Sequence, residues 1–186
     1  MNDTVIFDSS TLINIFCSGY YSSIFESLKQ QLMVSQLVIS ESNYYYESGK
    51  KQSLDLDYFT SQGIFDRAEL NAEEYPLFIV FAQQLDDGEA ETIAIGINRG
   101  WSIAIDDRKA IKLIRERYPD AHVFCTPAIV KNWADNTTQR EESVQKVIEN
   151  IENYARFRPS NRKFYDEYLK CKEQFDWWQK ISTRND

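Results

Sequence analysis

Short apolar runs and amphipathic stretches alternate along the first 130 residues of the chain. The apolar runs at 5–8, 36–39, 101–105 and 123–126 are bounded by polar residues, and a weaker extended piece begins at 63–65. Such runs are typical of parallel strands that are buried on both faces. Strands that alternate with helices predict an α/β fold, in which helices cover both faces of a mostly parallel sheet.

The expected helices lie between these runs. Ser9-Ser10-Thr11 supplies N-cap chemistry for a helix directly after the first strand. Ser40 is expected to cap a helix that runs through Glu47 and ends at Ser48-Gly49. Helical spacing is also found at 21–28, 51–62, 77–85, 89–98 and 108–117, and after Pro127, which suits the first turn of a helix.

The pattern changes near residue 136, beyond which it predicts two amphipathic helices and no strand. Apolar residues at helical spacing mark the first helix at Val144, Val147, Ile148, Ile151 and Tyr154, and the second at Phe164, Tyr168, Cys171, Phe175 and Trp178. Residues 156–161 form the break between them. We therefore expect an α/β domain of residues 1–135, followed by a helical extension of residues 136–186.

Composition fits one α/β domain with such an extension. The chain has 186 residues, 42% of them hydrophobic, which excludes disorder as a description of the whole chain. No apolar stretch is long enough to span a bilayer, so we expect no membrane association. The three cysteines, Cys17, Cys125 and Cys171, are widely spaced. They argue against a disulfide framework or a zinc site and favour a cytoplasmic location. The single histidine, His122, is expected to be structural or on the surface.

The net charge of −8 is unevenly distributed. Residues 1–130 contain 10 basic and 19 acidic side chains, a balance of −9, whereas residues 131–186 contain 11 and 10, a balance of +1. This acidity argues against tight, non-specific binding to long duplexes, because that binding depends on the neutralisation of phosphates. A small, specific RNA substrate remains compatible with it.

Acidic residues follow two of the predicted strands. Asp8 ends the first apolar run, and Asp106-Asp107 follow the run at 101–105. Between them, Asp86-Asp87-Gly88-Glu89-Ala90-Glu91 opens an apolar helix. Because ligands bind at the carboxyl ends of the strands in an open α/β sheet, these acids are expected to meet over one crevice. Clustered carboxylates favour a hard cation such as Mg²⁺ or Mn²⁺, so the pattern predicts a metal-dependent phosphodiesterase.

Each acid also has a structural interpretation. Asp8 is expected to bind a cation while Ser9 and Ser10 hydrogen-bond to the substrate, and its structural alternative is a helix N-cap. Asp106 and Asp107 point to opposite sides if the strand continues, so one is expected to face the crevice and the other to cap the next helix. Glu89 and Glu91 do not share a helix face, and acids in a first turn are ordinary partners of the helix dipole.

Three segments together resemble PIN-domain ribonucleases, as found among the toxins of bacterial and archaeal toxin–antitoxin pairs. They are Val5-Ile6-Phe7-Asp8-Ser9-Ser10-Thr11-Leu12-Ile13, Gly88-Glu89-Ala90-Glu91-Thr92-Ile93-Ala94 and Ile103-Ala104-Ile105-Asp106-Asp107-Arg108-Lys109-Ala110. The similarity covers roughly residues 4–135 and also includes the strand at 124–126. It implies a three-layer α/β/α fold and a protein inhibitor, the antitoxin, as a partner; a homodimer is a further expected assembly.

The resemblance also implies an acidic quartet that holds one or two Mg²⁺ or Mn²⁺ ions for RNA hydrolysis. Asp8 corresponds to the first acid. Glu47 corresponds to the second, with Glu41 as its competitor. The third is Glu89 or Glu91, and the fourth is Asp107 or Asp106. On this basis the metal ligands are expected among Asp8, Glu89, Asp106 and Asp107.

Two other functions compete with the nuclease. A haloacid-dehalogenase phosphatase needs an acid two residues after its nucleophilic aspartate, and that position here is Ser10. A PIN-like scaffold that binds protein or RNA without cleavage is the second alternative. In the extension, Arg156, Arg158, Arg162 and Lys163 lie among aromatic residues. They are expected to contact RNA phosphates, whereas the structural alternative is that the aromatic face only packs on the sheet domain.

Overall fold

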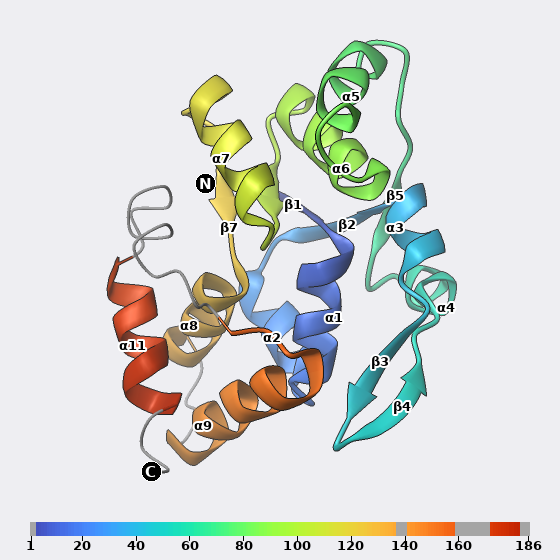
Figure 1. Ribbon diagram of the computed structural model, residues 1–186. Helices are drawn as coiled ribbons and strands as arrows, with labels where there is room; N and C mark the ends of the chain where they lie inside the picture. Colours follow the sequence, from blue (N-terminus) through green and yellow to red (C-terminus); the bar gives the residue numbers. More distant parts are fainter. Residues whose placement is uncertain (1–2, 137–140, 159–171, 183–186) are drawn as a thin grey trace.

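The computed structural model describes residues 3–136, 141–158 and 172–182 and contains a parallel sheet of five strands (Figure 1). The strand order is β5-β2-β1-β6-β7, and each neighbouring pair is parallel. The strands are β1 (Thr4–Phe7), β2 (Gln31–Ser35), β5 (Asp66–Ala68), β6 (Ser102–Ala104) and β7 (Val123–Phe124). The α/β fold with a parallel sheet that the sequence predicted is confirmed.

Helices cover both faces of this sheet. Side chains alternate between the two faces along each strand, so apolar residues on successive positions need a cover on each side. Phe7 of β1 faces one hydrophobic core, whereas its neighbour Ile6 faces the other. Figure 1 shows the two helical layers above and below the sheet. The Phe7 side holds α1 (Ser9–Cys17), α2 (Tyr21–Leu28), α4 (Leu56–Ser61), α8 (Thr126–Asn136), α9 (Glu141–Asn150) and α11 (Lys172–Ser182). The Ile6 side holds α5 (Tyr75–Ala82), α6 (Asp87–Asn98) and α7 (Arg108–Arg117).

The second strand lies earlier in the chain than the sequence predicted. The run at 36–39 is not a strand but part of helix α3 (Gln36–Glu41), and β2 ends at Ser35. Ser35 caps α3, since its hydroxyl oxygen accepts a hydrogen bond from the backbone N–H of Val38. A short apolar run fits either a strand or one buried helix face, and here the cap selects the helix.

The helix expected at 40–47 is also wrong. Residues Tyr44–Glu47 (β3) and Lys50–Ser53 (β4) form an antiparallel hairpin instead. Ser48 and Gly49 both have positive φ angles, 49° and 78°, as a two-residue hairpin turn requires. The three tyrosines of β3 favour an extended backbone over a helix. The helix expected at 51–62 is therefore shortened to α4.

The described C-terminal helices pack onto the sheet domain. Val147, Ile148 and Trp178 are buried in the same core as Phe7 and Val34. The stretch Ile151–Ala155 (η1) is a π-helix that ends at Arg156, which has a positive φ of 56°. Packing of the aromatic face is thus confirmed for Trp178, while the domain boundary at residue 135 stays a prediction. No helix within the described ranges is long and apolar enough to cross a membrane.

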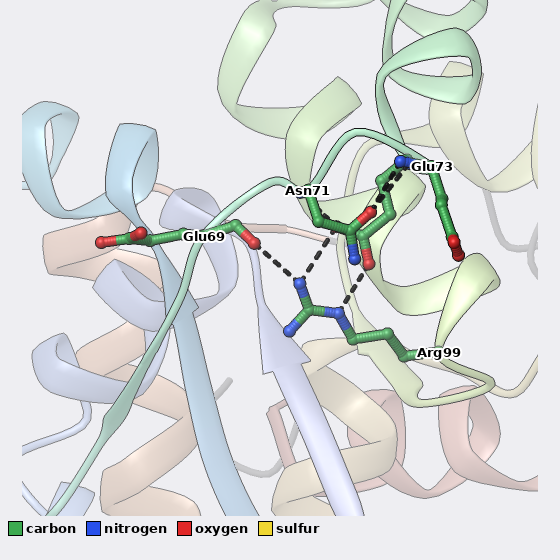
Figure 2. A network of polar contacts seen from close by, with 5 residues as sticks. Glu69, Asn71, Glu73 and Arg99 are labelled. Atoms are coloured by element: carbon green, nitrogen blue, oxygen red, sulfur yellow. Dashed lines mark hydrogen bonds and ion pairs between the residues drawn. The ribbon is translucent and has the colours of Figure 1, made fainter.

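An ion pair joins the end of α6 to the start of α5, as Figure 2 shows. The Arg99 guanidinium donates from Nε to Glu74 Oε1 (2.6 Å) and from Nη2 to Glu74 Oε2 (3.0 Å). The same Nη2 donates to the carbonyl of Glu69 (2.7 Å). The Glu74 side chain is fully buried, so this pair fixes α5 against α6 at the end of α6 that lies opposite its acidic N-terminus.

Candidate active site

Asp8 lies directly after the central strand β1 and is buried, with 1% of its surface exposed. Its Oδ2 atom accepts hydrogen bonds from the backbone N–H (3.1 Å) and the hydroxyl of Ser10, and so it caps α1. Its Oδ1 atom is buried and has no hydrogen-bond partner among the described residues. Capping therefore accounts for one oxygen only, and the other is available to a ligand.

Asp106 lies just beyond β6, and its carboxylate is surrounded by donors. Oδ1 accepts from the backbone N–H of Thr126 (2.8 Å), while Oδ2 accepts from the Thr126 hydroxyl, from Asn14 Nδ2 (2.9 Å) and from Thr11 Oγ1 (3.3 Å). Burial raises the pKa of this carboxyl despite these hydrogen bonds, and the charge of Asp8 raises it further. Asp106 thus ties β6 to α1 and α8 beside Asp8.

Asp107 is half-buried and caps α7, because its Oδ1 accepts from the backbone N–H of Ala110 (2.8 Å). The prediction that one acid of this pair caps the following helix is confirmed. The other carboxylate oxygen of Asp107 is not used by that cap. The charge of Asp107 raises the pKa of both Asp8 and Glu89, so this side chain lies near both of these carboxyl groups.

Glu89 and Glu91 have different surroundings, although both lie in the first turns of α6. Glu91 is buried and its Oε2 accepts from the backbone N–H of Leu37 (3.0 Å), which caps the start of α3. Glu89 is half-buried and faces Asp8 and Asp107. Burial and these two charges, with that of Asp86, raise its pKa from 4.5 to about 7.

Glu41, at the end of α3, lies near the same acids. Burial raises its pKa, as do the charges of Asp8, Asp86, Asp87 and Glu91. Its carboxylate lies against Gly88, where a Cβ atom would overlap Glu41 Oε2. The glycine of the Gly-Glu-Ala-Glu segment therefore makes room for an acid from another helix.

Glu47 does not join this group. It lies at the turn end of the β3–β4 hairpin, is exposed and pairs in register with Lys50. The resemblance to PIN-domain ribonucleases gives Glu47 as the second acid, with Glu41 as its competitor. Of these two, Glu41, at the end of α3, is the one whose pKa the charge of Asp8 raises. Which of them serves as the second acid stays a prediction.

The expected substrate contacts are divided between two places. Ser10 donates its hydroxyl to Asp8 and so orients that carboxylate, while Ser9 is half-buried beside it. Arg156 and Arg158 are exposed after η1. Their contact with RNA stays a prediction, and Arg162 and Lys163 lie outside the described residues.

The side chains gathered around Asp8 have the type of ligand atom that a hard divalent cation prefers. All of these atoms are carboxylate oxygens, several carboxyl groups raise one another's pKa, and Asp8 offers a buried oxygen without a partner. Within the described part of the chain, no three acidic, histidine or cysteine side chains are gathered tightly enough to hold one ion in this conformation. Glu41 and Glu89 have long side chains, so rotation about their χ angles would be the means of closing the group around a cation.

A model of the PIN domain matches residues 4–173 of this chain, including the three acidic segments. The chain belongs to the PIN-domain family. Searches of the curated proteins and of the solved structures gave no match. PIN domains are generally nucleases and typically use divalent metals, so membership supports a nuclease-type hydrolase at the level of the family.

Sequence reasoning missed the polar residues that hold Asp106 in place. Asn14 and Thr126 are buried, and Asn14 donates to both Asp106 Oδ2 and Thr126 Oγ1 (3.2 Å). A signal existed, since Thr11 and Asn14 are polar residues three apart on an otherwise apolar helix face. Such a pair indicates a buried polar partner on a neighbouring element.

The acidic cluster should make the metal-free protein less stable at neutral pH than at mildly acidic pH. In the folded state Glu89 takes up a proton at about pH 7, whereas the unfolded chain does so near 4.5. Protonation thus favours folding, and the free energy of unfolding should fall as pH rises from about 4.5 to about 7. Urea denaturation in EDTA at several pH values measures this. Glu89→Gln should reduce the slope, and an unchanged slope would argue against the interpretation.

Gly88→Ala should separate stability from activity in this PIN domain. Alanine is preferred over glycine inside a helix by roughly 0.5–1 kcal/mol, and the overlapping atom is the flexible end of Glu41. We expect an unchanged or higher melting temperature, but nuclease activity reduced about 10- to 100-fold because Glu41 is displaced. Gly96→Ala is the matched control: its Cβ would meet Ile103 and Ile6, so it should lower stability by about 1–3 kcal/mol.

Proposed function

We propose that this PIN domain is an endoribonuclease that hydrolyses RNA phosphodiester bonds with the help of Mg²⁺ or Mn²⁺. The observation that carries the proposal is the buried Oδ1 atom of Asp8, without a hydrogen-bond partner among the described residues and next to further acids. A folded protein tolerates such a buried carboxylate when a cation completes its surroundings.

In this proposal Asp8, Glu41, Glu89 and Asp107 hold the metal. When bound, the ion would activate a water molecule and stabilise the negative charge that develops on the phosphate. The protein's own part is to hold these carboxylates in position. Ser10 orients Asp8, and the hydrogen bonds that Asp106 accepts from Asn14 and Thr126 fix the end of β6. We therefore assign Asp106 a positioning role and Glu91 the capping of α3.

Glu41→Gln and its matched control Glu47→Gln test this assignment. Both remove one negative charge from a glutamate on neighbouring elements, but only Glu41 lies beside Asp8. We expect Glu41→Gln to reduce metal-dependent cleavage of single-stranded RNA about 10- to 100-fold, with Glu47→Gln close to wild type. A larger loss of cleavage in Glu47→Gln than in Glu41→Gln would assign the role of second acid to Glu47. No cleavage by the wild type in any divalent metal would favour the non-catalytic scaffold.

A ribonuclease that acts inside its own cell needs control, so we include a toxin role, with an inhibitor protein as partner, in the proposal. The partners, whether RNA, an antitoxin or a second copy of this chain, stay predictions, as does the cytoplasmic location. Expression of the chain in bacterial cells, with Asp8→Asn as control, tests the toxin role. Growth arrest by the wild type alone is the expected result, and normal growth would contradict it.

A further inference from the structure

A cleft of about 640 Å³ opens between the β3–β4 hairpin and the π-helical turn η1. Figure 1 places the hairpin beside the end of α9, where η1 begins. Tyr45, Tyr46 and Asn43 line the hairpin side, Tyr154 and Arg156 line the opposite side, and Glu41 lies at one edge. Helix α1 contributes Ile13 and Cys17. The size is within the range of small-molecule and cofactor sites, roughly 300–1,000 Å³.

The walls of this cleft are held by packing. The Tyr45 ring contacts Phe16 of α1, with 5.4 Å between the ring centroids, so the hairpin is fixed to the core. At the hairpin turn, a Cβ atom on Gly49 would lie 3.7 Å from Cε1 of Tyr154. The turn therefore approaches Tyr154 closely, and the two sides meet at the turn end of the hairpin.

The backbone on the opposite side has two uncommon features. Residues Ile151–Ala155 form a π-helix. This conformation is rare in proteins overall, and where it occurs it is often at a functional site. Arg156 follows with a φ of 56°, which costs a non-glycine residue roughly 1 kcal/mol or more. Together they bring Tyr154 and Arg156 to the cleft, the first half-buried and the second exposed.

Glu41 links the cleft to the acidic cluster. It lines the cleft, and its carboxylate lies against Gly88 in the first turn of α6, the helix that carries Glu89. A polymer cleaved beside Asp8 would therefore pass next to this cleft.

We propose that the cleft binds one unpaired nucleobase of the RNA, next to the phosphodiester that is cleaved. This inference rests on the proposed function and adds that the substrate is single-stranded at this position. The Tyr154 ring offers a face for stacking, and the Arg156 guanidinium at the rim suits a phosphate. A base held in a duplex is stacked and paired, and would have to leave the helix to enter.

The charges around the cleft favour RNA over an acidic protein segment or an apolar one. Lys51 of β4 lies over the ring of Tyr44, which lines the cleft, with Nζ 3.8 Å from the ring centroid, and Arg156 lines the cleft from the other side. The chain as a whole has a charge of −8, so a local group of cations beside an acidic cluster is where a polyanion gains most. Aromatic rings interleaved with cations are the usual means of holding single strands.

The test measures RNA binding in the Asp8→Asn background, where cleavage does not interfere. The probe is a short single-stranded RNA with 2-aminopurine at a central position, whose fluorescence falls when the base stacks on a ring. Tyr154→Leu keeps an apolar side chain but removes the ring. We expect Tyr154→Leu to raise the Kd for this RNA about 5- to 150-fold and to reduce the quenching of 2-aminopurine fluorescence on binding. Tyr154→Phe keeps the ring and should have a Kd and quenching close to those of the parent protein. Tyr75→Ala, at an exposed tyrosine of α5, is the control for the loss of a ring elsewhere.

Arg156→Gln should weaken binding and reduce the slope of log K against log salt by about 0.7, as expected for one phosphate contact on a single strand. Arg117→Gln, at the exposed end of α7, should leave the slope unchanged. A duplex of the same sequence should bind more weakly than the single strand.

The outcomes separate this inference from the proposed function. Metal-dependent cleavage by the wild type, together with equal Kd and quenching for Tyr154→Leu and its parent, would overturn the cleft and leave the nuclease. Binding that depends on Tyr154 without cleavage by the wild type would support the cleft and refute the nuclease. Equal binding of single strand and duplex would also overturn the inference.

Discussion

Replacement of Asp8 by asparagine should reduce metal-dependent RNA cleavage about a thousandfold or more while the fold stays intact. Asparagine keeps an oxygen that can accept from the N–H of Ser10, so the cap of α1 is retained. The charge that would attract a divalent cation at the buried Oδ1 position is lost. Initial rates on a single-stranded RNA in Mg²⁺ and in Mn²⁺ measure the effect.

Asp55→Asn is a matched control for this change. Asp55 also caps a helix, α4, with Oδ1 accepting from the backbone N–H of Tyr58 (2.9 Å), but it is exposed and is not one of the acids that we propose to hold the metal. The Asp55→Asn variant should cleave RNA at the same rate as the wild type. Burial and the charge of Asp107 raise the pKa of Asp8 in the folded protein, so Asp8→Asn should melt no lower than wild type in EDTA. Undiminished cleavage by Asp8→Asn would contradict the proposed role of this residue.

Arg99→Ala should be among the most destabilising single changes in this protein, costing about 3 kcal/mol. The Glu74 side chain is fully buried, and Arg99 supplies both a positive charge and two hydrogen bonds to it. Removal of the guanidinium leaves a buried carboxylate without its cation, which is more costly than the pair itself was stabilising. Chemical denaturation at pH 7 measures the change. Arg67→Ala is the matched control, since the Arg67–Asp57 pair is exposed and should contribute about 0–1 kcal/mol.

The pH dependence gives a second readout of the Arg99 change. Burial alone would raise the pKa of Glu74, but hydrogen bonds from Arg99 and from the Asn71 backbone, with the charge of Arg99, lower it below its usual range. A lowered pKa stabilises the fold above the unfolded value near 4.5, and this stabilisation is lost as pH falls through the folded pKa. Arg99→Ala should therefore lose less stability on acidification than wild type. A cost below about 1 kcal/mol at pH 7 would contradict this account.

Much of the fold could be predicted from the sequence because its strands are short, apolar and bounded by polar residues. Asp8 and the Asp106-Asp107 pair were placed correctly at strand ends, since an acid directly after a buried strand has little choice of position. The prediction for residues 36–53 is wrong because Leu37, Val38 and Ile39 fit a strand and a buried helix face equally well. A strand at 36–39 leaves residues 40–47 for the helix that follows it, so the β3–β4 hairpin could not be predicted.

The roles within the acidic site depended on contacts between distant segments. Sequence alone could not distinguish Glu89 from Glu91, because the distinction rests on the Leu37 N–H that Glu91 accepts from. Nor could it assign Asp106 to a network with Asn14 and Thr126, which come from helices on either side of it in the chain. Local patterns predicted which elements carry acids, and tertiary packing decided which oxygen atoms are left for a metal.

Diffraction from crystals soaked in Mn²⁺, recorded near the manganese absorption edge, is the sharpest test of metal binding by Asp8. We expect an anomalous peak from an ion that is coordinated by Asp8 Oδ1 and by carboxylates from Glu41, Glu89 or Asp107, and we expect this peak to be lost in Asp8→Asn crystals. A manganese ion bound elsewhere, or no ion at Mn²⁺ concentrations that support RNA cleavage, would contradict this expectation.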